Sequence, residues 1–78
     1  MNRKIKLIWD FRGPDALETA KHHTMHLKEF ATMENLHFYE AATEQTSEHH
    51  AIACMIIDEK DLLTFRDALH PHRAVVTA

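Results

Sequence analysis

Residues 49–57 constrain the fold more than any other part of the chain. The segment reads His-His-Ala-Ile-Ala-Cys-Met-Ile-Ile and is largely apolar at both odd and even positions. Successive side chains of a strand point to opposite faces, so a strand with this sequence is apolar on both faces. Strands of that kind usually lie inside a sheet, with other structure packed on each side. We therefore predict a central strand here.

A second strand pattern lies near the start of the chain. Residues 4–12 alternate, with one face formed by Ile5, Leu7, Trp9 and Phe11. The opposite face carries Lys4, Lys6, Ile8, Asp10 and Arg12. A period of two predicts a strand that ends at Gly13-Pro14.

Residues 14–34 predict one long helix, because Pro14 suits its first turn and residues 15–34 contain neither Gly nor Pro. Spacings of three and four place Ala16, Ala20, Leu27 and Phe30 on one apolar stripe. His23 falls within this stripe, whereas His22 and His26 lie on its flank.

The rest of the chain predicts two further strands and one further helix. Residues 36–45 favour a strand that turns near residues 46–48, and residues 73–77 favour a short last strand. Between residues 58 and 71 we expect a helix that Asp58 caps and Pro71 ends. Its buried stripe is expected to be Leu62, Phe65 and Leu69.

The predicted order is β-α-β-β-α-β, the split βαβ pattern of a ferredoxin-like α+β fold, in a single domain over residues 1–78. We expect a four-stranded antiparallel sheet with both helices on one face. The other face would then expose the second apolar side of residues 49–57, namely Ile52, Cys54 and Ile56. Because a large exposed apolar patch marks an interface, we predict a homodimer through this open sheet face.

The chain resembles ferredoxin-like domains of the dimeric α+β barrel superfamily, which includes small monooxygenases, muconolactone-isomerase-like proteins and YCII-related proteins. Two short pieces are similar to the YCII-related branch. One is His26-Leu27 in the first helix, and the other is Asp67-Ala-Leu-His-Pro-His72 after the second, where three residues separate Asp67 from Pro71. The Gly-rich segments common in that branch are absent. The resemblance implies a dimer and marks His26 as a candidate site residue.

Composition narrows the classes of partner. The formal charge of −3 gives no basic surface for nucleic acid, so no nucleic-acid partner is expected. No apolar stretch approaches the ~20 residues that span a membrane, and no signal peptide is recognisable. The single cysteine, Cys54, excludes an internal disulfide and a cysteine-based zinc site and suits a reducing compartment. We therefore expect a cytoplasmic protein that binds neither membranes nor nucleic acid.

Histidine is abundant, with eight residues among 78. His22 and His26 are four positions apart and share a helix face, a spacing that metalloproteases use to bind zinc. The glutamate that such enzymes carry between the two histidines is missing here. A third ligand would have to be Glu29 or a histidine from another element.

His23 is expected to face the sheet, where burial would favour its neutral form. With Asp10, Glu40 or Glu44 as a partner it could act as a general base. The alternative is a structural histidine that bonds a backbone carbonyl or a tyrosine. Tyr39 is the aromatic residue best suited to a ligand contact, because a buried hydroxyl needs a partner.

Three functions remain open from the sequence. The first is a homodimeric module that binds a small-molecule ligand or a partner. The second is a small cofactor-independent enzyme in which His23 or His26 is the base and Tyr39 or Asp10 orients it. The third is a metal binder that uses His22 and His26. No cofactor is expected.

Overall fold

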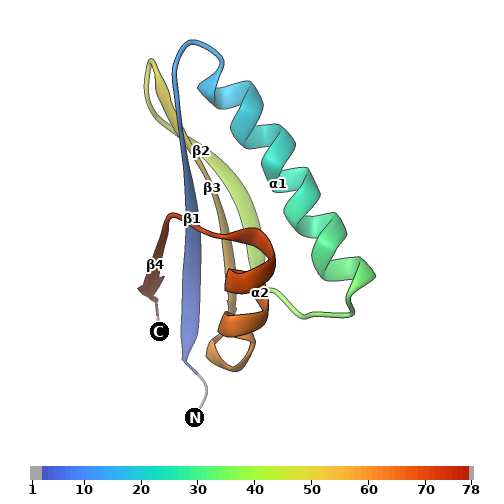
Figure 1. The fold of residues 1–78 in the computed structure, drawn as a ribbon. Coiled ribbons are helices and arrows are strands. Elements are labelled where there is room, and N and C mark those ends of the chain that lie inside the picture. The colour runs from blue at the N-terminus through green and yellow to red at the C-terminus, as the bar shows by residue number, and fades with distance from the viewer. Residues whose placement is uncertain (1–2, 78) are drawn as a thin grey trace.

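The computed structural model describes residues 3–77. Within these residues, four strands, two α-helices and one 3₁₀ turn follow in the predicted order (Figure 1). Their bounds are β1 Lys4–Arg12, α1 Ala16–Met33, β2 Glu40–Ser47, β3 His50–Asp58, η1 Glu59–Asp61, α2 Leu62–Leu69 and β4 Arg73–Val76. Neither helix is long and apolar enough to cross a bilayer.

The four strands form one antiparallel sheet in the order β2-β3-β1-β4. β3 is an inner strand, as its two-sided apolar sequence predicts, and it pairs with β1 from Lys4↔Asp58 to Arg12↔His50. This order confirms the ferredoxin-like α+β fold. β4 pairs only with residues 5–8 of β1, so the second half of β1 lies at the edge of the sheet.

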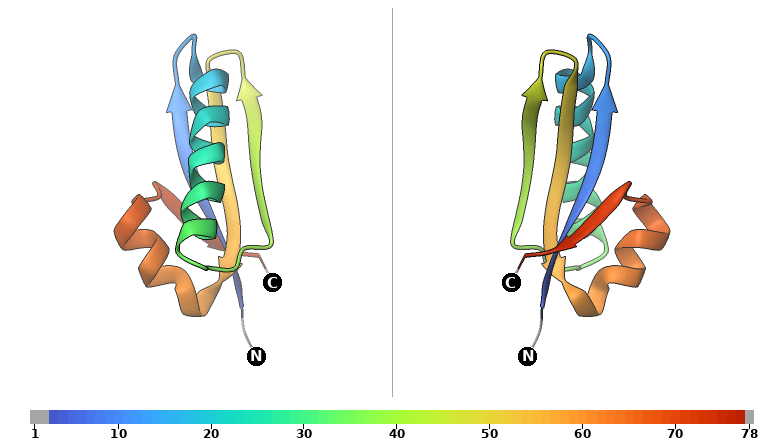
Figure 2. Two further views of the ribbon diagram at one scale, coloured as in Figure 1. Left: turned by 90° about the vertical axis from the view of Figure 1, so that its right-hand side faces the viewer. Right: turned by 90° about the vertical axis from the view of Figure 1, so that its left-hand side faces the viewer.

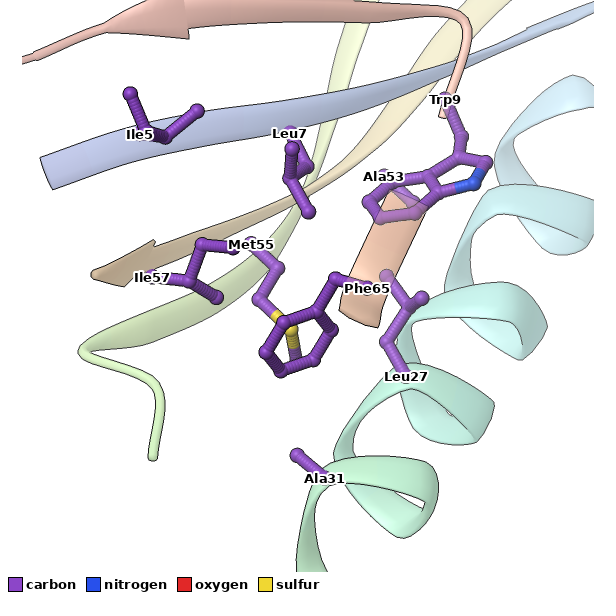
Figure 3. Packing of buried hydrophobic residues seen from close by; sticks show 9 residues of the cluster. All are labelled: Ile5, Leu7, Trp9, Leu27, Ala31, Ala53, Met55, Ile57 and Phe65. Carbon is purple, nitrogen blue, oxygen red and sulfur yellow. The ribbon is translucent and has the colours of Figure 1, made fainter. Parts of the chain in front are cut away.

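One hydrophobic core joins both helices to the same set of alternating strand residues (Figure 3). Its buried members are Ile5, Leu7, Trp9, Leu27, Ala31, Ala53, Met55, Ile57 and Phe65. Leu27 and Ala31 come from α1, and Phe65 is the fully buried residue of α2. In Figure 2, α1 runs along the sheet, and α2 lies to one side of α1. The predicted apolar stripes of both helices therefore face the sheet.

Small residues let α1 approach the sheet closely near its N-terminus. Ala16 and Ala20 of α1 pack against Ala51 of β3, and all three are buried. Further along, the Thr24 hydroxyl donates to the carbonyl of Ala20 at 2.9 Å and lies 2.7 Å from the Thr43 hydroxyl of β2. These contacts fix the height of α1 above the sheet, on which the shape of the candidate site depends.

The turn between β1 and α1 needs its glycine. Gly13 has a φ of +112°, a conformation that residues with a side chain rarely adopt. Its amide donates to the carbonyl of His49 at 2.8 Å, which ties this turn to the hairpin between β2 and β3.

β2 begins and ends later than the sequence pattern indicated. Residue Asn35 adopts a left-handed φ of 55°, and the amide of Leu36 bonds back to the carbonyl of Ala31, which ends α1. Pairing with β3 starts only where the amide of Tyr39 donates to Ile56. The expected strand start at residue 36 is therefore wrong, because the residues before Tyr39 close the helix and cover the core.

The prediction that Asp58 caps the second helix is also wrong. Asp58 ends β3, makes no capping hydrogen bond, and is followed by η1 before α2 begins. Its carboxylate instead accepts the Tyr39 hydroxyl at 2.6 Å. The reason is burial: Asp58 is only 6% exposed, and a buried carboxylate needs a donor at hand.

Candidate functional site

A groove of about 470 Å³ lies between α1 and the second half of β1. We call it the histidine groove, and its lining consists of Phe11, Glu18, Thr19, His22, His23 and His26. Five of these residues come from the first turns of α1 and one from β1. The groove follows from the fold, because the alanines of α1 bring the helix down and β4 leaves this end of β1 uncovered.

His23 forms the inner wall of the histidine groove. Its ring meets Trp9 edge-on with 5.2 Å between centroids and Phe11 in the same way at 5.4 Å. Its Nε2 atom is buried and has no hydrogen-bond partner within residues 3–77. A buried polar atom left in this state costs about 1–3 kcal/mol.

The surroundings of His23 keep its imidazole neutral. Burial lowers its pKa below the ordinary value, and positive charge on His26 and on His72 lowers it further. A neutral imidazole offers one N–H donor and one lone pair, so His23 can either donate to or accept from a ligand.

Trp9 holds this wall in place from below. The residue is only 3% exposed, and its indole N–H donates to the carbonyl of Leu69 at 2.8 Å. Leu69 is the last residue of α2, so the bond satisfies one of the carbonyls that a helix leaves free at its end. Trp9 thereby connects β1, α1 and α2 behind His23, in the core.

His22 and His26 lie together on the outer rim. Their rings stack with 4.7 Å between centroids and an angle of 12° between their planes. Nδ1 of His26 also lies 3.5 Å from a carboxylate oxygen of Glu29. The structure therefore brings His22, His23 and His26 to one groove, with His23 inside and the other two exposed.

The stacked arrangement is not that of a metal chelate. A histidine binds a metal through the nitrogen lone pair, which lies in the ring plane, and two nearly parallel stacked planes do not converge on one ion. Within residues 3–77 no group of three or more histidine, cysteine or acidic residues is placed to hold a metal. Metal binding by His22 and His26 stays a prediction that needs a rotation of at least one ring.

Asp10 lies on the opposite face of the sheet from His23. Its carboxylate accepts two bonds from Arg73, at 2.9 and 3.0 Å, and one from Nε2 of His50 at 3.0 Å. Nδ1 of His50 in turn contacts the hydroxyl of Thr46. The backbone amide of Asp10 donates to Nδ1 of His72 at 2.8 Å. We call these five residues the Asp10 network.

The Asp10 network joins all four strands, one residue or more from each. Partial burial by itself raises the pKa of Asp10, but the hydrogen bonds and positive charges of Arg73 and His50 outweigh it and hold this pKa below its usual value. The carboxylate is thus occupied and ionised, and it is not available to orient His23. The sequence marks Asp10 as a candidate site residue, but it does not predict that Thr46, His50 and Arg73 belong to the same network.

Tyr39 lies at the other end of the sheet. It precedes β2 beside Ile56, whereas Phe11 of the histidine groove pairs with Ala51. Its hydroxyl is bonded to Asp58, which together with burial raises its pKa. The four candidate catalytic residues therefore occupy three places: His23 and His26 share the groove, while Asp10 and Tyr39 each stand apart. Glu40 and Glu44, the other partners considered for His23, are exposed on β2.

Comparisons with family models, with curated proteins and with solved structures give no significant match to this chain. The resemblance to the dimeric α+β barrel superfamily therefore stays a prediction, supported by strand order alone. A fold of this kind does not fix a function, which has to come from the residues of the site.

Replacing Asp10 with asparagine tests the Asp10 network. Asp10→Asn keeps the size of the side chain but removes the charge that Arg73 and His50 bind. We expect the free energy of unfolding at pH 7 to fall by about 1–2 kcal/mol in chemical denaturation. Because the folded pKa of Asp10 is lowered, its stabilising effect is present above the unfolded pKa of about 3.9 and is lost as pH falls through the folded value.

The difference between wild type and Asp10→Asn should therefore shrink below about pH 4. Asp15→Asn serves as the matched control, because Asp15 is exposed and its side chain makes no capping bond to α1. Equal stability of the Asp10 variant and wild type at pH 7 would show that the network contributes nothing to folding.

Proposed function

We propose that this protein is a small-molecule-binding domain whose ligand occupies the histidine groove. The observation that carries the proposal is that His23 lines this groove while its buried Nε2 has no hydrogen-bond partner within residues 3–77. Ligand sites in proteins combine an apolar concave surface with a few polar groups that fix orientation. The groove has this composition, with Phe11 beside a polar atom that lacks a partner.

The lining indicates the chemistry of the ligand. The ring of Phe11 in the lining suits a flat apolar body, and a nitrogen of His23 suits one hydroxyl or carboxylate group on it. His22 and His26 at the rim add ring N–H donors, which suit an anionic group. A small aromatic acid or phenol combines these properties.

Binding is a better-supported function than catalysis. A histidine acting as general base is usually oriented by a second group, such as a carboxylate on its other nitrogen. Asp10, the partner considered for His23 from the neighbouring strand β1, is on the other face and bonded to Arg73 and His50. The lowered pKa of His23 also weakens it as a base, although it keeps the ring neutral and ready to form hydrogen bonds.

The proposal is tested with benzoate, phenol and benzyl alcohol as probes, added separately to isotope-labelled protein and followed by NMR. At millimolar probe we expect saturable shifts at His23, Phe11 and Trp9 for at least one of them. His23→Phe keeps an aromatic ring in the wall but removes Nε2, and it should weaken that binding about tenfold, as the loss of one buried hydrogen bond predicts.

His37→Phe is the matched control, because His37 is exposed and lies beside Tyr39, away from the groove. Its binding should equal that of wild type. If no probe shifts the groove resonances, or if His23→Phe binds as well as wild type, Nε2 of His23 does not recognise a ligand of this class.

We further propose that two copies associate through the open face of the sheet, which faces the viewer in the right-hand view of Figure 2. The expected exposure of Ile52 and Cys54 is wrong, because they are 5% and 3% exposed in the single chain. Support for the proposal comes from the apolar character of the strip that they form with Ile8 and from the partly exposed Ala42 packed against it. Beside the strip, Val75 is 47% exposed. Long charged side chains border this strip, a composition typical of an interface with an apolar centre and a polar rim.

Sedimentation equilibrium at micromolar concentration tests the homodimer. A dimer has twice the mass of the 9.1 kDa chain. Ile56→Lys adds a charge to the partly buried centre of the open face and should shift the protein to monomer, whereas Leu63→Lys on the exposed side of α2 should not. A wild-type protein that sediments as a monomer contradicts the proposal.

A further inference from the structure

The open face of the sheet is divided by charge along its strands. β2 presents Glu40 and Glu44 on this face, opposite Ile56 and Ile52 of β3. On the other side of β3, the same face of β1 carries the cations Lys4, Lys6 and Arg12. Asp10 is the acidic exception on β1, and Arg73 of β4 neutralises it. One flank of the face is therefore acidic and the other basic.

From this division we infer how two copies pair: the two-fold axis of the dimer runs parallel to the strands. This inference rests on the proposed homodimer and adds the orientation of its partner, a second copy of this chain. A rotation about such an axis exchanges the two flanks, so the acidic flank of each copy covers the basic flank of the other.

The register shows which residues meet. Glu40 shares a rung of the sheet with Lys6, through Ile56. A rotation about an axis along the strands keeps each residue at its height, so Glu40 of one copy lies over the flank that holds Lys6 in the other. Glu44 shares a rung with Asp10, which Arg73 neutralises, and Arg12 lies two residues further along β1. Each dimer contains the approach of Glu40 to Lys6 twice.

Other two-fold arrangements lose this match. Stacked sheets pack either aligned or orthogonal. An aligned dimer with its axis across the strands places β2 over β2, which brings Glu40 and Glu44 against carboxylates of the same flank. In an orthogonal dimer, the strands of one copy cross those of the other. The acidic flank of one copy then crosses the basic flank of the other at one point and does not cover it along its length. Like charges across an interface oppose association, which leaves the strand-parallel axis.

Two complementary charge reversals test the arrangement. Glu40→Lys/Glu44→Lys makes both flanks basic, and Lys6→Glu/Arg12→Glu makes both flanks acidic while leaving the Asp10 network intact. In sedimentation at low salt, the dimer dissociation constant of each variant alone should be at least about tenfold higher than that of wild type. An equimolar mixture should recover a heterodimer, because every flank then meets its opposite.

Lys21→Glu/Lys28→Glu is the control, since it changes net charge by the same amount on exposed positions of α1 and should leave the dimer unchanged. Circular dichroism checks that each variant folds. The wild-type protein adds an independent measurement: its dimer dissociation constant should rise as salt screens the complementary flanks.

The outcomes separate this inference from the proposed function. A monomeric wild type overturns the homodimer and the axis together, without bearing on ligand binding in the histidine groove. A wild-type dimer whose reversal variants stay dimeric, or whose mixture forms no heterodimer, overturns the axis and leaves the homodimer standing. A dissociation constant that does not change with salt also contradicts the charge-matched axis.

Discussion

The packing of Trp9 against both helices is the contact on which the rest of the structure depends. Its indole fills the space between β1 and the helices, donates to the end of α2 at Leu69, and meets the ring of His23 from α1. A smaller side chain here would leave a cavity and an unpaired carbonyl at once. The position of α2, the course of the chain into β4 and the wall of the histidine groove all follow from this one residue.

The alternation of β1 then separates two kinds of chemistry. Trp9 and Phe11 point toward α1 and create an apolar wall in which a histidine stays neutral. Asp10 lies between them in the sequence but faces the other way, into a network of cations that keeps it ionised. Neighbours along the chain therefore belong to different surfaces, one suited to a ligand and the other to a partner chain.

Much of the fold could be predicted because it depends on local periodicity. The alternation of residues 4–12 and the two-sided apolar segment 49–57 predict β1 and β3, and the stripe with Leu27 predicts which side of α1 is buried. The start of β2 could not be predicted in this way, because the residues before Tyr39 have strand-like composition yet close the C-terminus of α1.

The candidate site was predicted only in part. Helical spacing alone places His22, His23 and His26 together and turns His23 inward, and the structure agrees on both points. The partners of Asp10 depend on register between strands far apart in sequence: His50 comes from β3, and Arg73 comes from β4. No pattern within a single element encodes that register, so pairing Asp10 with His23 was a reasonable hypothesis that the structure does not bear out.

The most direct measurement of this account is the pKa of His23, obtained by NMR titration of the histidine ring protons, with His23→Phe used to assign its signal. Burial against Trp9 and Phe11 predicts a pKa clearly below the ordinary histidine value of about 6.5, so that the ring is neutral at pH 7. The folded protein should correspondingly lose stability as pH falls from about 6.5 through that lower value. A His23 pKa at or above the ordinary value would mean that the ring is solvated or paired with an anion, and would contradict the partly buried ring with a buried, unpartnered Nε2 on which the proposed binding site rests.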